Sequence, residues 1–146
     1  MAQAQSYENH ARYDPLFHYT LLPILVLNLV FAILYAVKHH AQHVHLSIWW
    51  IVLSLTFILM AGRARGAALQ VQDRVIRLEE KLRLSQLASP SELVELDSLT
   101  IDQYIGLRFA SNPEVVELAR RAVREKLTRK QIKQNVKSWR ADNDRA

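Results

Sequence analysis

The chain has 146 residues, a mass of 16.9 kDa, no cysteine and a formal net charge of +5. This length has room for one compact domain or two small ones, which excludes multidomain enzymes, and the lack of cysteine excludes a disulfide scaffold. The mean hydropathy of −0.05 hides two unlike halves. Residues 1–62 contain two basic and two acidic residues, whereas residues 63–146 contain 17 and 12, so the second half carries the whole net charge.

The first half contains two apolar segments that are long enough to cross a membrane. Residues 16–37 are 22 residues without a fixed charge, which at ~1.5 Å per residue span a hydrocarbon core of ~30 Å. Residues 46–62 are a second run of 17 residues, near the lower limit for a span. A buried globular core is the alternative, but the 84 residues that follow are too few to wrap two apolar helices. We therefore predict an all-α membrane protein with a transmembrane hairpin over residues 15–62, after a short segment over residues 1–14.

The distribution of positive charge predicts the orientation of this hairpin. The connecting loop, residues 38–45, contains one lysine, whereas Arg63, Arg65, Arg74 and Arg77 follow the second span. Basic segments stay on the cytoplasmic side, so we predict that both termini lie in the cytoplasm. The first run is longer than a signal-peptide core and no clear cleavage site precedes Lys38, so we expect it to stay attached.

Three polar side chains of the predicted spans fall inside the hydrocarbon core. In an antiparallel hairpin that closes near residues 41–42, Asn28 lies within reach of Ser54 or Thr56 on the other span. The first interpretation is an interhelical hydrogen bond, worth ~0.6 kcal/mol in measured cases. A substrate or ion pathway is the second, and the absence of any carboxylate, lysine or arginine within the spans favours the first.

The loop also holds four of the six histidines, at His39, His40, His43 and His45. If the first helix continues past Val37, His39 and His43 share one face at a spacing that can hold a metal ion. The loop has no Cys, Asp or Glu to complete a zinc site, and neutral histidines are also acceptable at a membrane interface. The loop histidines therefore have two interpretations. They bind a metal ion or sense pH, or they are polar residues at the membrane interface with no further role.

The second span is predicted to continue into a long cytoplasmic helix over residues 63–86. Its apolar residues follow the 3-4-3-4 spacing of a coiled-coil seam, at Ala68, Val71, Val75, Leu78 and Leu82. Two interpretations stay open, because the seam either meets another subunit or packs on the later helices of its own chain. The pattern covers about two heptads, and a firm prediction of a coiled coil needs three or four.

Residues 87–146 are predicted to form a helical cytoplasmic domain of four short helices. Each begins at a capping signal, namely Ser89-Pro90-Ser91-Glu92, Thr100-Ile101-Asp102-Gln103, Asn112-Pro113-Glu114, and Thr128 with Gln131. No strand periodicity occurs between them.

The last of these helices is expected over residues 129–141 as a basic amphipathic helix. Ile132, Val136 and Trp139 form its apolar stripe, and the flank beside it consists of Lys130, Lys133, Lys137 and Arg140. The first interpretation of the basic flank is a solvent-exposed face above a packed apolar stripe. The second is a surface that contacts anionic lipid or a partner, and the last is a surface that binds nucleic acid.

No catalytic motif occurs in the sequence. The three glycines cannot form a glycine-rich phosphate loop, and neither a zinc-protease nor a nucleophile-elbow pattern is present. We therefore expect neither an enzyme nor a bound cofactor.

Four runs of the sequence resemble a family of small bacterial membrane proteins of uncharacterised function: NHARYDPLFHYTLLPILVLNLV at 9–30, QDRVIRLEEKLRL at 72–84, LTIDQYIGLRFAS at 99–111 and IKQNVKSWRAD at 132–142. The resemblance implies a bacterial inner-membrane protein with two spans and a helical cytoplasmic tail, and it implies no reaction, cofactor or catalytic residue. The expected function is a membrane-tethered interaction or assembly module that associates with itself or with a partner protein. The alternative is a transport or sensory accessory protein that responds to metal or pH through the loop histidines.

Overall fold

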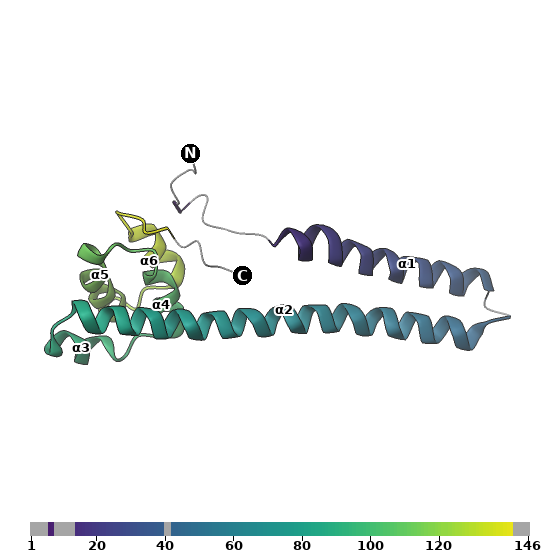
Figure 1. The fold of residues 1–146 in the computed structure, drawn as a ribbon, viewed down its shortest axis with the longest axis horizontal. Coiled ribbons are helices and arrows are strands. Elements are labelled where there is room, and N and C mark those ends of the chain that lie inside the picture. Colours follow the sequence, from purple (N-terminus) through teal and green to yellow (C-terminus); the bar gives the residue numbers. More distant parts are fainter. Residues whose placement is uncertain (1–5, 8–13, 40–41, 142–146) are drawn as a thin grey trace. The chain divides into compact units, whose positions relative to one another are not determined.

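A computed structural model describes residues 6–7, 14–39 and 42–141, and every named element in these ranges is a helix (Figure 1). The elements are a π-helical turn at Leu16–Leu21, α1 at Leu22–His39, α2 at Val44–Leu87, α3 at Pro90–Leu96, α4 at Ile101–Leu107, α5 at Asn112–Arg124 and α6 at Arg129–Asn135. The chain divides into two compact units. One contains α1 and α2 as far as Ala68, and the other contains α2 from Leu69 and all later helices.

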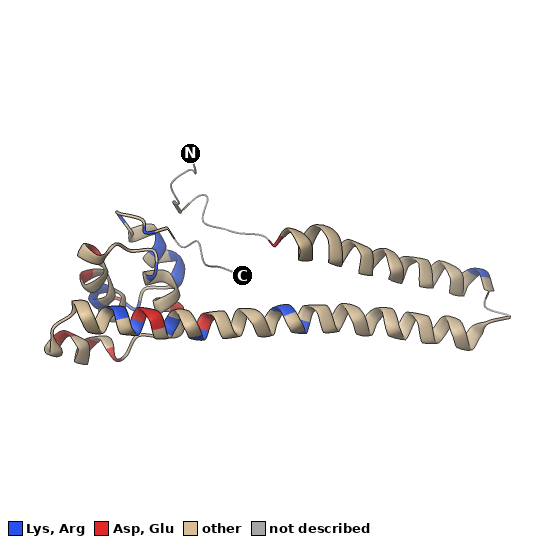
Figure 2. Cartoon of the chain, viewed as in Figure 1, with Lys and Arg blue, Asp and Glu red and all other residues tan. Residues whose placement is uncertain are grey.

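The first unit is a hairpin of two apolar helices. Residues Leu16–His39 and the first part of α2 are each long and apolar enough to cross a membrane. Figure 2 shows that charged residues are rare on these helices and frequent on the second half of α2 and beyond. Among the described residues of this unit, only Ala32, Ser47 and Ser54 are buried, so most of the apolar side chains face the surroundings.

The four capping signals begin four short helices in the second unit. Ser89, Thr100 and Thr128 are N-caps of α3, α4 and α6, each in a reciprocal capping box. The N-cap of α5 is Ser111 rather than Asn112, and the Glu114 carboxylate accepts the N–H of Ser111 at 3.2 Å. A side chain that accepts an N–H in the first turn satisfies a group that the helix itself leaves without a partner.

The core of the second unit lies where α4, α5 and α6 meet the end of α2. Its largest fully buried side chains include Phe109, Leu84, Ile105, Leu107, Ile132 and Val115. Helices α4 and α6 approach closely at Gly106, where an added Cβ would lie 3.0 Å from two atoms of the Ile132 side chain. A buried amide closes the end of α5, because Gln103 Nε2 donates to the carbonyl oxygens of Ala122 at 2.8 Å and Leu127 at 3.2 Å.

The last helix is shorter than the sequence predicts. Helix α6 ends at Asn135, and Val136 is extended, so residues 136–141 do not continue the amphipathic helix expected up to Ala141. Trp139 instead forms an antiparallel bridge with Ala110, and Arg140 donates its N–H to the Phe109 carbonyl at 2.8 Å. The Trp139 and Phe109 rings lie 5.0 Å apart. Pairing with a distant backbone segment and ring packing together replace the local helical hydrogen bonds.

Glu114 holds this extended segment in place. Its carboxylate accepts the backbone N–H groups of Lys137 and Ser138, both at 3.0 Å, in addition to that of Ser111. Burial opposes ionisation of Glu114, but the hydrogen bonds from these N–H groups outweigh it, so the pKa of Glu114 is lowered below 4.5. The ionised carboxylate is therefore part of the folded structure.

Replacing Glu114 with Gln should lower the free energy of unfolding by about 1 kcal/mol at neutral pH, because a neutral amide oxygen is a weaker acceptor than a carboxylate. A lowered folded-state pKa contributes stability that is present above the unfolded-state pKa and is lost as the pH falls through the folded-state pKa. Thermal unfolding of the purified full chain should therefore separate the wild type from E114Q at pH 7, and the difference should shrink below about pH 4. An equal difference at both pH values would contradict a role for the ionised carboxylate.

Candidate functional site

The second half of α2 has two different faces. Its inner face, Ile76, Glu80 and Leu84, is at most 7% exposed. Its outer face, which we define as Val71, Val75, Leu78 and Leu82, has exposed fractions of 61%, 45%, 68% and 63%. The outer face is the predicted seam, and it does not pack on the later helices of the same chain. The stripe that does so is the inner face, which sequence periodicity did not single out.

An ion pair between the buried Glu80 and the partly buried Arg83 links the inner face to the loop between α4 and α5. Arg83 pairs with Glu80 at 3.1 Å and donates to the Ala110 carbonyl at 2.7 Å and to Asn112 Oδ1 at 2.8 Å. Arg140 Nη1 lies 3.7 Å from the second oxygen of Glu80. Burial raises the pKa of Glu80 even though both arginines favour its charged form. The inner face is thus occupied by the chain's own groups.

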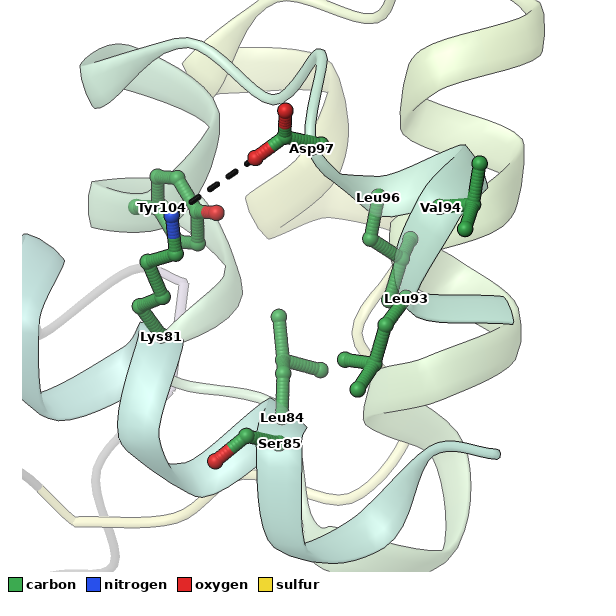
Figure 3. A pocket seen from close by; sticks show the side chains of 8 residues that line it. All are labelled: Lys81, Leu84, Ser85, Leu93, Val94, Leu96, Asp97 and Tyr104. Carbon is green, nitrogen blue, oxygen red and sulfur yellow. Dashed lines mark ion pairs between the residues drawn. The ribbon is translucent and has the colours of Figure 1, made fainter. Parts of the chain in front are cut away.

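A pocket of about 390 Å³ lies beside this region, between the end of α2, helix α3 and Tyr104 of α4. Figure 3 shows Leu84, Leu93 and Leu96 on its wall, with Lys81 reaching toward Asp97 at a distance of 3.6 Å. Its volume falls within the range of small-molecule sites. The sequence analysis did not find it, because its lining comes from three separate helices and carries no motif.

The hairpin contains the interhelical polar contact between Asn28 and Ser54. Asn28 Nδ2 donates to Ser54 Oγ at 2.8 Å, and Trp50 Nε1 donates to Asn28 Oδ1 at 3.2 Å. Ser54 in turn donates to the Trp50 carbonyl at 2.8 Å. Thr56 does not join this network, because it is exposed and donates to the carbonyl of Val52 in its own helix.

The structure brings two of the loop histidines together. The ring centroids of His39 and His43 lie 6.2 Å apart, and the Tyr35 ring lies 4.6 Å from His39. His45 is exposed on α2, and His40 lies outside the described residues. In the ranges that the structure describes, no group of three or more His, Cys, Asp or Glu could hold a metal ion.

The predicted basic flank does not form one continuous surface. Lys133 is 7% exposed, with Nζ 5.0 Å from the centre of the Phe109 ring. Arg140 lies beside Glu80, whereas Lys130 and Lys137 are exposed. Ile132, Val136 and Trp139 pack in or against the core, so the stripe that was expected on an amphipathic helix belongs to the domain interior.

One comparison with known proteins gives a match over the full length of the chain. A model of a family of unknown function (DUF6526) matches residues 1–146. No curated protein and no solved structure matches the chain.

Proposed function

The chain belongs to this family, whose function is unknown, and we propose that it is a bacterial inner-membrane protein whose hairpin anchors an interaction surface on the cytoplasmic side. The proposed surface is the outer face of α2. The observation that carries the proposal is the exposure of these four apolar residues on a helix that continues directly from the hairpin.

The composition of the hairpin supports the membrane location. Its apolar side chains are mostly exposed, as they are where lipid is the solvent. Its most deeply placed polar groups, Asn28 and Ser54, satisfy each other across the two helices, which lipid demands because it offers no hydrogen-bond partner. The arginines that follow Gly62 support a cytoplasmic location for the second unit.

The outer face supports the interaction role. Single exposed apolar residues are ordinary, but a row of four at coiled-coil spacing is typical of a surface that another helix covers. The inner face of the same helix already packs on the later helices, so we expect a helix that covers the outer face to come from another chain.

A second candidate function rests on the pairing of His39 with His43, which supports a sensory or transport accessory role on the far side of the membrane. Two imidazoles supply half of a four-coordinate zinc site.

The topology can be tested with a reporter enzyme that is active only outside the cytoplasm. We expect activity when the reporter is inserted after Gln42 and none when it is fused after Ala146, because the basic residues keep the second unit in the cytoplasm. The opposite pattern would overturn the proposed location of the interaction surface.

The interaction surface can be tested by amine-reactive crosslinking of the full-length protein in its membrane. We expect crosslinked species larger than the monomer, and we expect L78D/L82D to lose them because aspartate at seam positions opposes association. The matched control is Q70D, an exposed position on another face of α2, which should keep them. Thermal unfolding of L78D/L82D should stay within about 0.5 kcal/mol per substitution of the wild type, since both leucines are exposed. If the double variant keeps its crosslinked species, the outer face is not the interaction surface.

The histidine alternative can be tested by calorimetric titration of the detergent-purified full chain with Zn²⁺. If the loop holds metal, the wild type should bind and H39A/H43A should not, while the control H18A should bind as the wild type does. A wild type that shows no binding heat would remove the metal-dependent form of this alternative.

A further inference from the structure

We infer that the partner of the outer face is a second copy of this chain, parallel and in register, in a short two-stranded coiled coil. The inference rests on the proposed function and adds to it the identity, direction and register of the partner. It follows from three features of α2, namely the apolar residue types in the seam, the anchoring of one end and the charges beside the seam.

The central pair of the seam, Val75 and Leu78, has the residue types that suit two strands. In heptad notation Ala68, Val75 and Leu82 are a positions, and Val71 and Leu78 are d positions. A β-branched residue at a with leucine at d, as in Val75 and Leu78, favours a dimer over larger bundles. The buried residues Ile76, Glu80 and Leu84 are at b, f and c, so the chain's own helices leave the a and d positions open.

The anchor sets the direction. Helix α2 is continuous from Val44 to Leu87, so its first part lies in the hairpin and its last part in the helical domain. Every copy that is anchored in one membrane by this hairpin emerges with the same end of α2 at the membrane. Two outer faces can then lie side by side only in parallel. Confinement to one membrane also raises the effective concentration of the copies, which compensates for a seam of only about two heptads.

The charges beside the seam complement each other only in the parallel arrangement. Arg74 is at g and Glu79 at the e position of the next heptad, and both are exposed. In a parallel dimer these positions face each other across the interface, so Arg74 of each copy meets Glu79 of the other. An antiparallel dimer pairs g with g and e with e, which brings Arg74 against Arg74 or Lys81. The sequence of charges thus opposes that alternative.

Single cysteines test the register, because the natural chain contains none and each engineered thiol is unique. In membranes that contain the full-length protein, V71C and L82C should each form a disulfide-linked dimer on mild oxidation, because each residue meets its own counterpart. The control Q70C, exposed next to Val71 but off the seam, should not. Dimers that form only when V71C and L82C are mixed would establish an antiparallel pair and overturn the inference.

Charge reversal tests the pairing of Arg74 with Glu79. Either R74E or E79R places like charges across the interface twice, whereas a dimer of one R74E chain with one E79R chain restores opposite charges at both contacts. With L78C in both chains and a different tag on each, the mixed disulfide dimer should exceed random assortment by roughly threefold at low salt. The excess should disappear at high salt, where exposed charges are screened. Random assortment at low salt would overturn the assigned register.

These results separate the inference from the proposed function. If L78D/L82D abolishes crosslinking but neither V71C nor L82C links to itself, the outer face binds a different chain, so the proposed function stands and the inference falls. If the reporter shows the second unit outside the cytoplasm, the proposed location falls whatever the thiols do.

Discussion

Helix α2 runs without interruption over 44 residues, and its side chains meet different environments along its length. The other helices pack against one part of it or the other. Its first part is apolar almost all round and pairs with α1. Its second part is two-sided, with one stripe buried by α4 and its neighbours and the opposite stripe left apolar and exposed.

The contact between α2 and its own domain is polar at its centre. Glu80 is buried and pairs with the partly buried Arg83, which also donates to Ala110 and Asn112 at the α4–α5 connection. Removing charges from water is costly, and burial raises the pKa of Glu80 for this reason. Hydrogen bonds depend on direction as well as distance, so these contacts constrain where the α4–α5 connection lies against the helix.

The two helices of the hairpin are also joined by polar contacts, but between uncharged side chains. Asn28 both donates to Ser54 and accepts from Trp50, so one amide holds two points of the opposite helix. Small buried side chains, Ala32 and Ser47 among them, let the helices approach. Polar contacts of this kind contribute modestly to stability in lipid, but they select one register because a slip leaves the amide unsatisfied.

Local signals in the sequence were enough to predict the two apolar segments, the long helix that continues from the second, and the caps at Ser89, Thr100 and Thr128. These features depend on side chains within one or two helical turns of each other, so they can be predicted without knowledge of the tertiary structure. The positions of Asn28 and Ser54 along an antiparallel hairpin were likewise enough to predict that the two side chains lie close together. The tertiary structure alone decided that residues 136–141 leave the helix, because Trp139 pairs with Ala110 and Glu114 takes the N–H groups of Lys137 and Ser138. It also decided which stripe of α2 is covered. Both stripes have helical spacing. Contacts with residues of later helices and loops, such as those of Arg83 with Ala110 and Asn112, distinguish the buried stripe from the exposed one.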